Sequence, residues 1–134
     1  MASEAFAKLE PPERRFEIAV EFIRTGGSDG KGTGAPSTLG FGQKERLEYY
    51  KYYKQYTSGD ITTGKKPSLW NATLKAGGPI AGAETLMKFD AWTEVKGMGK
   101  EEALKGYIDA ILRHTLSYGR EKILLDFIKV MASK

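Results

Sequence analysis

Apolar residues recur at helical spacing in several stretches of this chain, and this pattern constrains the fold more than any other feature. In residues 13–24, Phe16, Ala19, Val20 and Ile23 fall at i, i+3, i+4 and i+7, which places them on one face of a helix. No strand pattern of comparable strength is present, so we expect an all-α fold. Similar patterns predict further helices over residues 43–57, 83–95, 100–116 and 121–131.

Glycine and proline mark the ends of these segments. Pro11 and Pro12 precede the first helix, and a pair of glycines ends it. Gly59-Asp60 ends the second helix. The remaining segments are residues 3–9, interpreted as a short turn or a frayed extension; residues 25–42, a long loop; and residues 61–82, an irregular segment.

The composition suits one compact globular domain. The chain has 134 residues, of which 40% are hydrophobic and 28% charged. It has no cysteine, so disulfides, a thiolate nucleophile and Cys-ligated metals are excluded. The net charge of +4 favours acidic partners such as phosphates but is small for a dedicated duplex-DNA binder. The N-terminus is charged, so we expect no secretory signal. No run of about eighteen apolar residues is present, so we expect no membrane span. We therefore expect a cytoplasmic protein.

Two sequence features superficially resemble functional sites, one for phosphate and one for a metal. The stretch GGSDGKGTG, residues 26–34, looks like a phosphate-binding loop, but Gly32 follows Lys31 where a hydroxyl residue belongs. A surface linker is the better interpretation. His114 is the only histidine and lacks a second metal ligand, so we expect it to be partly exposed near a helix end. We expect no catalytic residue, no metal, no cofactor and no enzymatic activity.

Residues 49–60, YYKYYKQYTSGD, concentrate tyrosine and lysine. On a helix, Tyr50, Tyr53 and Lys54 share one face. A core face of tyrosines would bury hydroxyls at about 1–3 kcal/mol each if unpaired. Phenols beside an ammonium group instead suit a ligand with a flat ring and phosphates. Composition alone leaves a nucleotide-like ligand and a half-exposed surface helix as alternatives. The other tyrosines form an adjoining face of unassigned role: Tyr49, Tyr52 and Tyr56.

Several short motifs in order resemble the acyl-CoA-binding protein family. They are YxxYKQ from Tyr50, the Gly59-Asp60 stop, KxDAW from Lys88 to Trp92, and the EAxxxYI of residues 102–108. The match covers roughly residues 16–112. The resemblance implies an up-down-down-up four-helix bundle with an extra C-terminal helical segment. It also implies one domain over residues 1–134, with the core match at about 13–116 and the extension at 117–134.

The resemblance implies a carrier that binds medium- to long-chain acyl-CoA esters reversibly and forms an intracellular pool. The ligand would be acyl-CoA or CoA, and enzymes that use acyl-CoA could receive it. We expect a monomer, no nucleic-acid partner and no stable membrane insertion. By motif position, Tyr50, Lys54 and Lys88 resemble the family's contacts to the ribose 3′-phosphate and adenosine. The implied ligand-binding residues are Tyr50, Tyr53, Lys54, Lys88, Tyr107, Arg24 and Val20.

The chain also departs from the family pattern. Phe89 replaces the usual tryptophan between lysine and aspartate, and Tyr56 replaces a usual alanine. The loops over 25–42 and 61–82 look longer than the family norm. These changes affect the expected acyl-length preference and groove shape more than CoA recognition.

Two questions remain open at this level. A single-stranded nucleic-acid or nucleotide binder could also use a tyrosine and lysine cluster. Such a binder requires a row of basic residues longer than this small cluster. The apolar stripe near the C-terminus could cover the bundle, mediate dimerisation or touch a membrane. Packing on the same chain is the default for such a stripe. Its members are Ile123, Leu124, Phe127, Ile128 and Met131.

Overall fold

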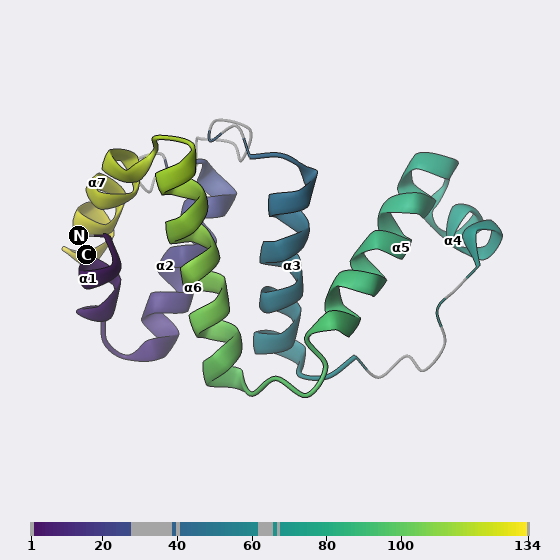
Figure 1. Cartoon of the computed structure of the whole chain (residues 1–134), viewed down its shortest axis with the longest axis horizontal. Coiled ribbons are helices and arrows are strands. Elements are labelled where there is room, and N and C mark those ends of the chain that lie inside the picture. The colour runs from purple at the N-terminus through teal and green to yellow at the C-terminus, as the bar shows by residue number, and fades with distance from the viewer. Residues whose placement is uncertain (1, 28–38, 40, 62–65, 67, 134) are drawn as a thin grey trace. The chain divides into compact units, whose positions relative to one another are not determined.

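The structure is a computed structural model that describes residues 2–27, 39, 41–61, 66 and 68–133. These residues form seven α-helices and no strand, which confirms the all-α prediction for this part of the chain (Figure 1). The loop predicted over 25–42, with its glycine-rich stretch, lies mostly outside the described residues. The helices are α1 (Ala2–Ala7), α2 (Pro12–Thr25), α3 (Gln43–Ser58), α4 (Leu69–Ala76), α5 (Pro79–Glu94), α6 (Lys100–Ser117) and α7 (Glu121–Ala132).

Helical spacing located α2, α3, α6 and α7 correctly. Gly26 follows α2 with φ 68° and donates its N–H to the carbonyl of Phe22, so it ends this helix as the sequence predicts. Gly59 follows α3 with φ 75° and donates to the carbonyl of Gln55 at 3.1 Å. Both glycines occupy the left-handed conformation that other residues rarely adopt. In place of the turn or frayed extension expected near residues 3–9, the short helix α1 is present.

The prediction of an irregular segment over residues 61–82 is wrong in part. Helix α4 begins after Ser68, whose side-chain oxygen accepts a hydrogen bond from the N–H of Asn71 at 3.1 Å. It ends at Gly77, which has φ 85°. Helix α5 begins at Pro79, earlier than predicted, because proline is well suited to the first turn of a helix. The Gly-Gly-Pro sequence is therefore a tight connection between two helices.

The chain divides into two compact units, and the first consists of residues 1–45 and 107–134. In this unit α7 contacts both α1 and α2 (Figure 1). The rings of Phe22 and Phe127 meet edge to face at 5.5 Å, and Arg14 Nη2 donates to the carbonyl of Met131 at 2.8 Å. The C-terminal apolar stripe therefore packs on its own chain, as the default predicts.

The second unit consists of residues 46–106 and contains most of α3, all of α4 and α5, and the beginning of α6. Helix α4 packs along α5 (Figure 1). Helices α3 and α5 run in the same direction, since successive turns of one meet successive turns of the other. In the expected up-down-down-up bundle, the two middle helices also run in the same direction. Within the described residues, no helix combines the length and the apolar character that crossing a membrane requires.

Candidate functional site

The turn after α3 is fastened to the end of α5. The indole Nε1 of Trp92 donates to the carbonyl of Gly59 at 3.0 Å. The carboxylate of Asp60 accepts from the backbone N–H of Gly97 at 2.7 Å and from the amide of Gln55 at 2.8 Å. The bonds from Trp92 and Gly97 link the turn after α3 to the end of α5 and the residues that follow it, and the bond from Gln55 holds the Asp60 carboxylate in place. The Gly59-Asp60 motif therefore does more than stop a helix.

The charge of Asp60 contributes to this fastening. The N–H of Gly97 and, after it, the amide of Gln55 hold the pKa of the Asp60 carboxyl below its usual value. Hydrogen bonds donated to a carboxylate favour its ionised form. The ionised carboxylate is therefore the acceptor at neutral pH, and charge-assisted bonds of this kind are stronger than neutral ones.

Two lysines lie over aromatic rings across the contact between α3 and α5. Lys88 Nζ is 5.4 Å from the centre of the Tyr50 ring, and Lys54 Nζ is 4.8 Å from the Trp92 ring. Each helix contributes one lysine and one ring, and on each helix the two residues are one turn apart. Such cation–π contacts are worth roughly 0.5–1 kcal/mol at exposed sites. We call Tyr50, Lys54, Lys88 and Trp92 the α3–α5 platform.

The two ammonium groups of the platform differ in their surroundings. Lys88 Nζ also lies 3.4 Å from Glu84 Oε1 on the same helix. Lys54 has no ion-pair partner among the residues that the structure describes. Lys54 is thus the platform cation whose charge is not already balanced by a carboxylate. Burial raises the pKa of the Tyr50 phenol, so this hydroxyl stays protonated at neutral pH and can donate a hydrogen bond.

The neighbouring tyrosines divide into exposed and packed residues. Tyr53, a predicted ligand residue, is 40% exposed. Tyr49 is buried. Tyr52 packs so closely on Gly106 that a side chain at that glycine would collide with its ring. Tyr56, at the position where the family prefers alanine, has Lys100 Nζ 4.8 Å from its ring centre. The adjoining face therefore has packing roles that the sequence left unassigned.

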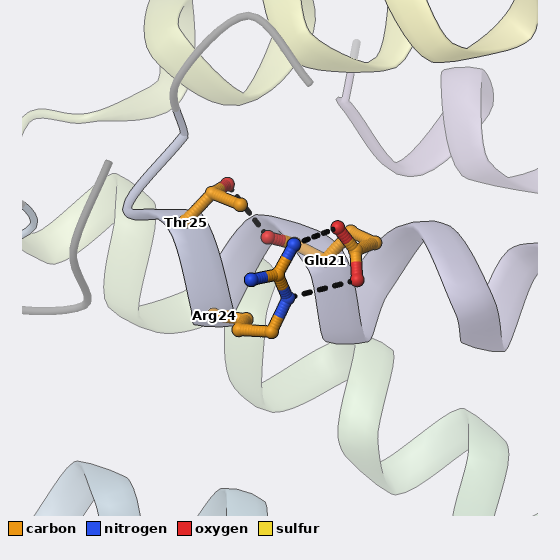
Figure 2. A network of polar contacts seen from close by, with 3 residues as sticks. All are labelled: Glu21, Arg24 and Thr25. Atoms are coloured by element: carbon orange, nitrogen blue, oxygen red, sulfur yellow. Dashed lines mark hydrogen bonds and ion pairs between the residues drawn. The ribbon is translucent and has the colours of Figure 1, made fainter. Parts of the chain in front are cut away.

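Three predicted ligand residues, Val20, Arg24 and Tyr107, belong to the first unit. Figure 2 shows Arg24 paired with Glu21 through two bonds, Nε to Oε1 at 3.0 Å and Nη2 to Oε2 at 2.6 Å. This pairing lowers the pKa of Glu21. Val20 is half-buried, and Tyr107 is buried with its ring 5.5 Å from that of Phe16. Their contact with a ligand stays a prediction.

Sequence reasoning missed Trp92 and Asp60 as parts of the site. Both belong to motifs that were recognised, KxDAW and Gly-Asp, but neither was assigned a role beyond the motif. An indole donor placed one turn after a lysine was the available signal. The lone histidine, His114, is half-buried in the last turn of α6, and its ring centre lies 5.9 Å from that of Phe41. This agrees with the expected position near a helix end.

Comparison with known proteins places these motifs in context. A family model described as "Acyl CoA binding protein" matches residues 13–111. The chain is 31% identical over 99 residues to "Acyl-CoA-binding domain-containing protein 5-B" of Danio rerio, covering 74% of this chain and 20% of that protein. It is 34% identical over 76 residues to "Acyl-CoA-binding domain-containing protein 2" of Oryza sativa subsp. japonica, covering 57% of this chain and 68% of that protein. No solved structure matches the chain. The chain thus spans about a fifth of the length of the Danio rerio relative.

Proposed function

We propose that this chain, which belongs to the acyl-CoA-binding protein family, binds medium- to long-chain acyl-CoA esters reversibly and carries them without chemical change. The family match covers residues 13–111. The observation that carries the proposal is the α3–α5 platform, because its residues come from the YxxYKQ and KxDAW motifs and meet across two helices. We further propose that the protein forms an intracellular pool of these esters for acyl-CoA-using enzymes.

The platform would recognise the adenosine and ribose 3′-phosphate of CoA. A phosphate with two negative charges favours two nearby cations, and Lys54 and Lys88 supply one from each helix. Charge-assisted hydrogen bonds of this kind are worth about 1.5–3 kcal/mol each. The protonated Tyr50 hydroxyl adds a neutral donor. The rings beneath the two ammonium groups orient them before the ligand arrives, which reduces the entropy lost on binding.

The acyl tail would supply the dependence on chain length. Each methylene removed from water contributes roughly 0.8 kcal/mol, so a long tail outweighs any single phosphate contact. Affinity should therefore increase with chain length until the apolar groove ends. Val20, Arg24, Tyr53 and Tyr107 are proposed to complete the ligand contacts, on the strength of their motif positions.

Binding without catalysis is the function that agrees with the family, which is one of binding domains. The comparisons give no support to the single-stranded nucleic-acid alternative. That alternative also requires a steep salt dependence and a basic track longer than this small cluster. A hydrolysis assay with palmitoyl-CoA tests for catalysis directly, and accumulation of free CoA above the background rate would contradict a pure carrier.

Isothermal titration with palmitoyl-CoA, CoA and free palmitate tests the proposal. We expect tight binding of palmitoyl-CoA, weaker binding of CoA and the weakest binding of palmitate, because only the first ligand engages both the platform and an apolar groove. A series of acyl-CoA esters of increasing length then measures where the gain stops. Equal and weak responses to all three ligands would overturn the proposed function.

A further inference from the structure

Large apolar side chains are exposed along α4 and at the beginning of α5. Among the described residues, few large hydrophobic side chains are exposed, and four of them fall within residues 69–80. The most exposed are Ile80 at 87% and Trp70 at 71%. Several large apolar side chains exposed within one short segment indicate an interaction surface. We call these four residues the α4 apolar face: Leu69, Trp70, Leu74 and Ile80.

The closest approach between α4 and α5 is made by small residues. Gly82 of α5 lies so close to α4 that a Cβ atom on it would be 2.7 Å from the Cα atom of Thr73. Ala72, the buried residue of α4, is also small. Trp70 and Leu74 lie one turn apart, on a different side of α4 from Ala72. Small residues therefore join the two helices closely, and Trp70 and Leu74 are left for another surface.

The unbalanced charge around this face is positive. Residues 66–84 contain Lys66, Lys75 and Glu84, and the exposed carboxylate of Glu84, one turn after Ile80, pairs with Lys88 at 3.4 Å. Lys66 pairs with Asp90 of α5 at 2.8 Å. Lys75 is exposed in the last turn of α4 and has no ion-pair partner among the described residues. An apolar face beside the unbalanced charge of Lys75 is complementary to a surface that is apolar below and anionic above.

We propose that the α4 apolar face docks on the surface of an anionic lipid bilayer. Tryptophan favours the boundary between headgroups and acyl chains, where Leu74 and Ile80 can also leave water. Lys75 would meet the anionic headgroups. An eight-residue helix is about 12 Å long, far short of the roughly 20 residues that a span requires, so α4 would lie within the interface.

A second copy of the chain is a less suitable occupant. Standard protein interfaces bury roughly 800 Å² on each partner, and four side chains cannot supply that area. The acyl tail of a ligand is also less suitable, because a tail needs a groove and these side chains are exposed by half or more of their surface. Both alternatives are distinguishable outcomes of the experiment below.

Vesicle sedimentation of the full chain, without acyl-CoA, tests the proposal. We expect stronger binding to phosphatidylcholine vesicles that contain roughly 30% phosphatidylserine than to pure phosphatidylcholine. The double variant Trp70→Ser with Leu74→Ser should lower the partition coefficient by at least about tenfold. Lys75→Gln, which removes one positive charge, should lower it about fivefold for the anionic vesicles. Leu116→Ser, at a 68% exposed position on α6, is the matched control and should bind as the parent does.

Tryptophan emission supplies an independent measurement. Trp70 should shift to shorter wavelength on vesicles, and Trp70→Phe should keep the binding while losing the shift. A shift that persists in Trp70→Phe would place the response at Trp92 and contradict the proposal. Unchanged vesicle binding by the helical double variant would also overturn it. A parent dimer in sedimentation velocity that the double variant abolishes would assign the face to self-association. A loss of palmitoyl-CoA affinity without any vesicle binding would assign it to the acyl tail.

Discussion

Helix α5 makes two different contacts within the second unit. With α3 it forms polar and cation–π contacts between specific side chains, and the ends of the two helices are fastened through Asp60 and Trp92. With α4 it forms a close contact between small residues, centred on Gly82 and Thr73. The first contact fixes the side chains that would bind CoA. The second leaves the large apolar side chains outside. One helix can therefore serve both recognition of a ligand and presentation of a surface.

The largest expected effect is the loss of packing between α4 and α5 when Gly82 is replaced. Gly82→Leu would force a side chain into the backbone of Thr73, and overpacking of this kind costs about 1–3 kcal/mol. We expect the amides of α4 to lose protection in hydrogen exchange while palmitoyl-CoA affinity stays at the parent value. Ala81→Leu, at the adjacent exposed position, is the control and should leave exchange unchanged. Retained amide protection in Gly82→Leu would show that the close approach of Gly82 to Thr73 is not needed to hold α4 on α5.

The two tryptophans provide a direct comparison of the two contacts. Trp92→Phe removes the donor to Gly59 and weakens the ring beneath Lys54, which should cost about 1–2 kcal/mol of unfolding free energy. Trp70→Phe changes an exposed ring of the α4 apolar face and should cost less than about 0.5 kcal/mol. Chemical denaturation of both variants measures the difference. Equal costs would contradict the distinction drawn between the two contacts.

Acid should weaken the fastening between α3 and α5. The pKa of Asp60 is lower in the folded protein than its usual value, chiefly because of the N–H of Gly97. Its contribution to stability is therefore fully present above the unfolded pKa and is lost as pH falls through the folded pKa. Unfolding free energies measured from neutral pH to below pH ~3 should decrease less steeply for Asp60→Asn than for the parent. Identical acid slopes would remove Asp60 from this role.

The smallest expected effect concerns the balance of charge on the platform. Glu84 pairs with Lys88 at 3.4 Å and competes with a phosphate for it. Because exposed ion pairs are worth at most about 1 kcal/mol, Glu84→Gln should tighten palmitoyl-CoA binding only about twofold. Glu94→Gln, which breaks the pair with Lys51 at 3.2 Å, is the control. Titration calorimetry measures both variants, and weaker binding by Glu84→Gln would contradict competition for Lys88.

Much of the fold was predictable because the spacing of apolar residues and the glycines and prolines at helix ends are local signals. The apolar spacing of α2 and the glycines after α2 and α3 locate those elements without any tertiary information. Helix α4 was missed because it is short and its Gly-Gly-Pro ending was interpreted as a loop. Its Ser68 cap and the suitability of Pro79 for a first turn were readable in the sequence.

The site was predictable in its residue types but not in its pairings. Motif position singled out Tyr50, Lys54 and Lys88, which the structure brings together on α3 and α5. That Lys54 lies over Trp92 depends on the register between the two helices. Contacts outside the motifs, including those of Gly97, set this register. The spacing of residues in a single sequence does not reveal the register between two helices.

The most direct test of the central claim asks whether Lys54 binds the ribose 3′-phosphate. Titration calorimetry compares the parent with Lys54→Ala, each against palmitoyl-CoA and its 3′-dephospho form, with Lys105→Ala as an exposed-lysine control. We predict that Lys54→Ala weakens palmitoyl-CoA binding by more than about tenfold, or 1.4 kcal/mol, with unchanged helical circular dichroism. The 3′-dephospho ligand should show little difference between the two proteins. Equal losses with both ligands, or no loss with either, would contradict the proposed role of the platform.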